Sequence, residues 1–214
     1  MLNVYRIACN MLQENCYIVS DDSKECVIID CGALYDEERE EIKEYIKQHQ
    51  LKPVCLVATH GHIDHHFGDP FIYKEYGLKP YVHKADRYLM EQLPAQSKTI
   101  AGFDLKEVMP EVGKYLTADD QIKFGSYVLT VIETPGHSRG GVFYYCAKEH
   151  IGFSGDTLFR NSIGRTDFEG GSMFQMIQSL RTLSQLPDQT RVYPGHGEST
   201  TIGEELANNP YMDR

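Results

Sequence analysis

Histidine and aspartate side chains gather in a stretch that directly follows the apolar run 54–58, which is typical of a buried strand. His60 and His62 lie two residues apart, so in an extended chain both side chains point the same way and can reach one metal ion. Asp64 and His65 follow where the chain must bend, and they can turn toward a second ion. Imidazole and carboxylate ligands suit zinc, iron or manganese better than Cu(I). This stretch therefore predicts a metal site on a loop at the carboxyl end of a strand.

A solvated loop is the alternative interpretation, because a single loop histidine is usually a surface residue. Here four ligand-type residues lie within the six positions 60–65. Burying so many polar groups without a cation would leave several of them unsatisfied at once. The pattern therefore favours the metal site over the solvated loop.

Three further fragments share this context: a strand-like run ends, a glycine allows a sharp turn, and a possible ligand is presented. They contribute His137, Asp156 and His196. Each fragment taken singly is also compatible with an ordinary turn. Together they add two imidazoles and one carboxylate, which converge if the strand ends lie side by side.

The resulting set contains seven possible ligands: His60, His62, Asp64, His65, His137, Asp156 and His196. Seven ligands are too many for one tetrahedral ion but suit two. We expect His60, His62 and His137 on one ion, Asp64, His65 and His196 on the other, and Asp156 bridging the two. Two divalent cations outweigh two carboxylates and a bridging hydroxide, so such a site would attract an anionic or polarised substrate.

Alternating strand and helix patterns surround these fragments and predict an α/β layered domain with strands inside and helices outside. The expected strands are 2–8, 15–20, 25–29, 54–58, 80–82, 121–124, 127–133, 142–146, 151–154 and 190–193, and the expected helices are 36–48, 69–76, 84–93, 172–183 and 201–208. Asp30 ends a strand, where it either caps a turn or orients a ligand imidazole. The irregular segment 94–113 is a lid, a wall or a surface insertion, and its composition slightly favours the insertion.

Size and composition narrow the class of protein. The 214 residues are most compatible with a single domain, 1–214. A net charge of −10 and a pI near 5.3 argue against a nucleic-acid backbone or an anionic membrane as the main partner. We see no apolar run long enough to span a membrane and no signal peptide. Six cysteines without a C-x-x-C pair then favour reduced thiols and a cytoplasmic protein, and the oligomeric state is left open.

The order of the motifs Thr59–His65, His137, Asp156 and His196 resembles that of the metallo-β-lactamase fold superfamily, and the resemblance covers nearly the whole chain. It implies a four-layer αββα sandwich with the metals at one edge of its two sheets. Asp64 and a bridging Asp156 are more similar to the hydrolase branch than to true β-lactamases. Zinc is the metal that this resemblance favours, with iron or manganese as alternatives.

Within that branch, the segments 154–159, 164–165 and 194–197 look like those of glyoxalase II, and the nearest likeness is to its short, single-domain relatives, the hydroxyacylglutathione hydrolase-like proteins. Only 18 residues follow His196, so we expect no C-terminal helical domain to hold glutathione. Arg165 fills the place of a basic residue that contacts the thiol cofactor. Family tyrosines are replaced by Asp167 or Phe168 and by Glu198, which disfavours glutathione itself.

The resemblance predicts hydrolysis of a small-molecule thioester by a metal-bridging hydroxide. Asp64 would hold its ion and hydrogen-bond the hydroxide, and Arg165 would anchor a substrate carboxylate, because its planar fork binds carboxylates bidentately. A surface salt bridge is the alternative role for Arg165, and Arg160 is a weaker candidate anchor.

Two other functions compete with this prediction. A persulfide dioxygenase of the same fold would hold one iron at His60, His137 and Asp156, and segment 164–168 resembles that family. Segment 194–197 fits the hydrolases better. A non-enzymatic binding module is disfavoured by the full set of ligands.

Overall fold

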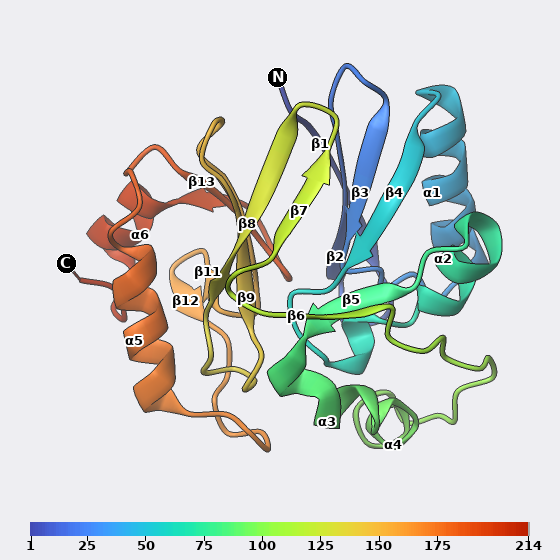
Figure 1. Ribbon diagram of the computed structural model, residues 1–214. Helices are drawn as coiled ribbons and strands as arrows, with labels where there is room; N and C mark the ends of the chain where they lie inside the picture. The colour runs from blue at the N-terminus through green and yellow to red at the C-terminus, as the bar shows by residue number, and fades with distance from the viewer. Residues whose placement is uncertain (214) are drawn as a thin grey trace.

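Two six-stranded sheets dominate the computed structural model, which describes residues 1–213 (Figure 1). The first sheet contains, in spatial order, β1 (Asn3–Cys9), β2 (Glu14–Ser20), β3 (Glu25–Ile29), β4 (Lys52–Val57), β5 (Pro80–His83) and β6 (Lys114–Leu116). The second contains β14 (Thr200–Thr201), β13 (Arg191–Pro194), β10 (Ile151–Gly155), β9 (Val142–Cys146), β8 (Tyr127–Glu133) and β7 (Gln121–Phe124). A separate small hairpin joins β11 (Leu158–Phe159) to β12 (Ser162–Ile163).

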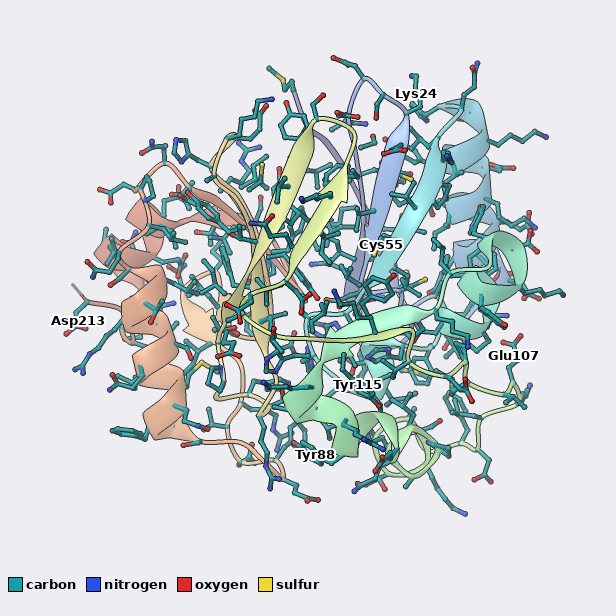
Figure 2. The ribbon with its side chains drawn as sticks, viewed as in Figure 1. Lys24, Cys55, Tyr88, Glu107, Tyr115 and Asp213 are labelled. Atoms are coloured by element: carbon teal, nitrogen blue, oxygen red, sulfur yellow. The ribbon has the colours of Figure 1, made fainter. Side chains whose placement is uncertain are left out.

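Helices cover the outer face of each sheet, as Figure 1 shows. α1 (Asp36–Gln48) and α2 (Asp69–Tyr76) pack on the first sheet, and α5 (Met173–Leu183) and α6 (Ile202–Asn208) pack on the second. Side chains of both sheets fill the space between them, among them Val27, Cys55, Leu129 and Phe153, and Figure 2 labels Cys55 there. The predicted four-layer αββα sandwich is therefore confirmed.

Local sequence patterns explain the individual elements. α1 buries Ile42, Tyr45 and Ile46 at helical spacing, and its Glu38 carboxylate accepts the backbone N–H of Leu34 at 2.8 Å. Ser172 caps α5 by accepting the N–H of Gln175, as its sequence predicts. These contacts place the helices where their apolar stripes meet the sheets.

Strand direction brings the predicted ligands to one edge. β3, β4 and β5 run parallel in the first sheet, and β10 and β13 run parallel in the second. Ile29 pairs with Val57 and Gly155 with Pro194, so neighbouring strands end at nearly the same level. The loops that follow these strands therefore meet at the same edge of the sandwich.

The predicted helix 84–93 is not one continuous helix. The chain forms a 3₁₀ turn at Lys84–Asp86, then α3 (Arg87–Met90) and α4 (Leu93–Gln96), which lie below the first sheet in the view of Figure 1. Pro94 explains the break, because a proline ring would clash with the carbonyl of Met90 if the helix continued.

Segment 94–113 is also more than a surface insertion. It contains one turn of π-helix at Ser97–Ala101, and the rings of Phe103 and Phe67 stack with centroids 5.7 Å apart. Phe67 belongs to the same apolar cluster as Ile63, which lies inside the predicted metal loop. The segment is a wall that packs against this loop.

The remaining differences are small. The strands β6, β11, β12 and β14 were not predicted. All six cysteines are free and buried, in agreement with the predicted absence of a disulfide framework. In residues 1–213, none of the helices has the length and apolar character needed to cross a membrane.

Candidate metal centre

The structure brings all seven predicted ligands together at the shared edge of the two sheets. His60, His62 and His137 present ring nitrogens that all lie within 4.8 Å of one another. Asp64, His65 and His196 form a second group that meets the same distance. The two groups are those expected from the sequence.

A short 3₁₀ turn at Ile63–His65 separates the two groups along the first loop. His60 and His62 precede this turn on an extended chain, with ring centroids 4.8 Å apart. The turn then places Asp64 Oδ2 3.2 Å from His196 Nε2 and the His65 ring 5.4 Å from the His196 ring. The six-residue stretch 60–65 therefore contributes side chains to both groups.

Asp156 lies between the two groups. Its Oδ2 atom is 3.5 Å from His137 Nε2 and 3.7 Å from His196 Nε2, and its Oδ1 atom is 3.5 Å from His65 Nε2. The carboxylate thus lies against histidines of both groups, with Oδ2 close to one histidine of each, and a bridging ligand needs such a position between the two groups.

Several buried atoms in this cluster have no hydrogen-bond partner among the described residues, including His60 Nε2, His65 Nε2 and Asp156 Oδ1. Buried polar atoms are normally paired, because leaving them unpaired costs free energy. Burial and the neighbouring His137 lower the pKa of His62 to about 3, and burial also holds the pKa of His60 well below its usual value. Both imidazoles are therefore neutral, which is the form that binds a metal. The residues fit divalent cations.

Backbone carbonyls orient two of the imidazoles. His137 Nδ1 donates to the carbonyl of Arg165 at 2.7 Å, and His196 Nδ1 donates to the carbonyl of Leu12 at 3.0 Å. Each bond points Nε2 into the cluster, where His137 Nε2 lies 2.8 Å from His62 Nδ1 and His196 Nε2 lies 3.2 Å from Asp64 Oδ2. Such outer contacts set both the tautomer and the ring orientation of metal ligands.

Asp30 lies against a third imidazole. Its Oδ2 atom lies 3.1 Å from His65 Nδ1, and its two oxygens accept the backbone N–H and the hydroxyl of Thr59 at 2.6 and 2.7 Å. Asp30 also has a left-handed backbone, with φ of 50°, which is strained for a non-glycine residue. Of the two roles considered for Asp30, the structure favours orientation of a ligand.

His66, the remaining histidine of the loop, supports the backbone. Its Nδ1 atom lies 2.7 Å from Asp69 Oδ2, and its Nε2 atom lies 3.0 Å from the carbonyl oxygen of His60. Both ring nitrogens are occupied, so His66 has no nitrogen left for a metal.

Two buried carboxylates beside the centre were missed in the sequence. Glu14 Oε2 accepts the N–H of Gly32, and its Oε1 atom lies 3.8 Å from His65 Nδ1. Asp86 lies in the 3₁₀ turn that follows β5, and it contacts the loops that hold the first group. The available signals were a charged residue directly before an apolar strand pattern and an aspartate three residues after another strand.

The loop 164–168 forms one wall of the centre. The ring of Phe168 lies 5.2 Å from that of His62 and 6.0 Å from that of His137. Arg165 stacks over Phe168 at 4.0 Å and makes two hydrogen bonds of 2.7 Å with the Asp167 carboxylate. The predicted anchor is thus exposed, close to the centre and paired with an acid of its own loop.

Arg160, the weaker candidate, pairs with Glu198 at 2.6 Å on the side of His196. The Phe159 ring lies 6.2 Å from that of His196. Aromatic rings therefore flank the ligand cluster on both sides.

Comparisons with known proteins agree with this geometry. The profile of the Metallo-beta-lactamase superfamily matches residues 9–196. Hydroxyacylglutathione hydrolase GloC of Haemophilus influenzae is 31% identical over 215 residues, which cover 99% of each chain. The crystal structure of BLEG-1, described as a B3 metallo-beta-lactamase, is 36% identical with a TM-score of 0.88 and 99% coverage of both chains. TTHA1623 in a di-iron-bound form is 32% identical with a TM-score of 0.86, covering 98% of this chain and 100% of the other. The chain belongs to the metallo-beta-lactamase superfamily.

Proposed function

We propose that this metallo-hydrolase cleaves a small-molecule thioester, such as a hydroxyacyl-thiol conjugate, with two divalent ions. The observation that carries the proposal is the presence of two complete three-residue groups with Asp156 between them. The likeness to a hydroxyacylglutathione hydrolase supports the substrate class. Zinc is the metal we favour, and the di-iron form of TTHA1623 makes iron the alternative.

Bound divalent ions supply two things to such a reaction: hydroxide at neutral pH and polarisation of the carbonyl group. The protein supplies the orientation. Asp64 Oδ2 lies 3.2 Å from His196 Nε2 inside the cluster, where its carboxylate accepts a hydrogen bond from the attacking nucleophile and fixes its direction. Phe168 excludes water on the side of His62. A thiolate is a good leaving group, so its departure needs little help from a protein acid.

Arg165 is the proposed anchor for a substrate carboxylate. Its stacking on Phe168 holds the guanidinium near the His62 side of the cluster. Because the Asp167 carboxylate already accepts two hydrogen bonds from the Arg165 guanidinium, a substrate carboxylate has to compete with it. The acyl group and the thiol carrier are therefore selected at an exposed loop and not by the ligands.

β-Lactam hydrolysis is the second candidate, favoured by the 36% identity to BLEG-1. It uses the same nucleophile on a different carbonyl. Persulfide dioxygenation is less favoured, because one iron at His60, His137 and Asp156 would leave the group of Asp64 and His196 without a role.

Metal analysis of protein purified without added metal tests the proposal, together with parallel assays on one preparation. The assays are lactoyl-thioester hydrolysis with several thiol carriers, opening of a chromogenic β-lactam, and oxygen uptake with glutathione persulfide. We expect about two zinc ions per chain and thioester hydrolysis as the fastest reaction, consistent with a dinuclear site. One iron per chain with oxygen uptake would contradict the proposal. Asp156→Ala is the control, and it should remove most of the metal and activity.

A further inference from the structure

Asp86 is a completely buried carboxylate outside the set of candidate ligands. Its Oδ2 atom accepts the backbone N–H of Gly61 at 2.9 Å and the hydroxyl of Ser138 at 2.7 Å. Its Oδ1 atom accepts the backbone N–H of Gly140 at 2.6 Å. Hydrogen bonds to a charged acceptor are stronger than those between neutral groups, so these three bonds hold their donors firmly against Asp86.

The three donors belong to the two loops that hold the first ligand group. Gly61 lies between His60 and His62, and Ser138 directly follows His137. Asp86 therefore links the loop after β4 to the loop after β8 through one side chain.

The contacts around this junction are tight. A side-chain carbon placed on Gly61 would lie 2.8 Å from Leu89 Cβ and 3.3 Å from Asp86 Cβ. One placed on Gly140 would lie 2.7 Å from the backbone nitrogen of Asp86. Both loops press directly against Asp86, so a shift of its carboxylate moves them relative to each other.

We propose that Asp86 is a positioning residue that sets the separation between His62 and His137 and thereby the metal affinity of the three-histidine group. The Nδ1 atom of His62 and the Nε2 atom of His137 lie 2.8 Å apart and come from the two linked loops. The second group has a different support, because Asp30 contacts His65 and the carbonyl of Leu12 holds His196. The proposal deepens the proposed function, since it rests on two ions being bound.

A residue that only stabilises the fold would affect both groups or neither. Glu205 provides a matched control, because it is also completely buried and accepts three hydrogen bonds. Its donors are Asn161 N, Thr200 Oγ1 and Asn209 Nδ2, at 2.6 to 2.8 Å. None of these donors adjoins a candidate ligand, so Glu205→Gln tests the loss of a buried carboxylate alone.

The experiment titrates each protein with zinc against a competing chelator and records both binding steps. Asp86→Asn should weaken one step about 10- to 100-fold, the usual effect of altering an outer contact of a metal ligand, and leave the other step within about twofold. Glu205→Gln should lose stability but keep both affinities. In His196→Ala, which keeps the three-histidine group complete, adding Asp86→Asn should weaken the remaining site by the same factor.

Several results would overturn the proposal: equal weakening of both steps, no weakening of either, or the same selective loss in Glu205→Gln. A wild-type protein with a single zinc step would overturn it as well. If Asp86→Asn does not fold, Ser138→Ala removes one of the three bonds and should weaken the same step by a smaller factor, and an unchanged step then refutes the proposal. Because zinc affinity is the readout, a protein that shows these shifts but cleaves no thioester refutes the proposed function only.

Discussion

Gly195 and Gly197 flank the candidate ligand His196 and offer a matched pair of substitutions. A side-chain carbon on Gly195 would lie 2.3 Å from Asp156 Oδ1 and 2.8 Å from His65 Cε1. A side-chain carbon on Gly197 would meet nothing within 4 Å, although the residue has a left-handed φ of 78°. Gly195→Ala therefore strains the centre itself, and Gly197→Ala strains only the local backbone.

The expected losses of catalytic rate and of stability follow from these distances. Ordinary contact begins near 3.4 Å, so Asp156 must move by about 1.1 Å (3.4 − 2.3) to accommodate alanine at position 195. A misplacement of about 1 Å lowers a catalytic rate roughly 100-fold. Overpacking of this kind costs about 1–3 kcal/mol of stability, and a left-handed alanine at position 197 costs about 1–2 kcal/mol. The two variants should thus be destabilised to similar extents, but only Gly195→Ala should disturb the geometry of the candidate metal centre.

Urea unfolding, metal content and thioester hydrolysis measured on both variants check this expectation. Gly195→Ala should lose bound metal and about two orders of magnitude in rate, whereas Gly197→Ala should keep its metal and most of its rate. If Gly195→Ala binds metal and turns over like the wild type, Asp156 is not the bridging group. If both variants lose metal equally, general destabilisation explains the loss.

Three further predictions concern the loop wall, the thiols and the core. Arg165→Ala should raise KM for a carboxylate-bearing thioester, and Asp167→Asn should lower it by freeing the guanidinium fork; steady-state kinetics that show no change in either variant would remove both residues from the binding site. Burial raises the pKa of Cys55 to about 12, so at pH 8 its thiol stays protonated. Iodoacetamide should therefore modify Cys55 only after denaturation. Mass spectrometry that finds alkylated Cys55 in the folded protein would contradict this. Tyr144→Phe removes the hydroxyl that donates to the buried carbonyl of Ala58 at 2.8 Å, and it should lower the free energy of unfolding by about 1–3 kcal/mol in urea, whereas a smaller change would mean that water replaces the bond.

The ligand set could be predicted because each member lies beside a strand end in the sequence. Glycine lies next to most of these strand ends. The carboxyl ends of parallel strands lie at the same edge of a sheet. The residue types then limited the chemistry to metal binding. Local sequence could also assign Asp64 and His62 to different groups, since a bend follows the extended pair His60 and His62 and turns the next side chains in another direction.

Other features depend on contacts that local patterns do not contain. The donors to Asp86 lie 25, 52 and 54 positions away in the sequence. His66 carries the same imidazole as its neighbour His65, and only the partners Asp69 and the carbonyl of His60 distinguish their roles. Strands of two residues, such as β11, β12 and β14, are too short to show an alternating pattern.

The proposed substrate anchor, Arg165, lies outside the ligand cluster. Relatives with 31% and 36% identity are described as a hydroxyacylglutathione hydrolase and a B3 metallo-beta-lactamase, so overall similarity does not select the reaction. In this chain the hydrogen bonds from Arg165 lower the pKa of Asp167 to about 2, and the carboxylate is therefore ionised at every pH at which the protein would work. On the proposed role of Arg165, an anionic substrate would have to compete with that permanent charge for one guanidinium, whereas a neutral substrate would not. If Arg165 anchors the substrate as proposed, the balance between Arg165 and Asp167 sets the preference for anionic substrates, and changing it should alter KM more than kcat.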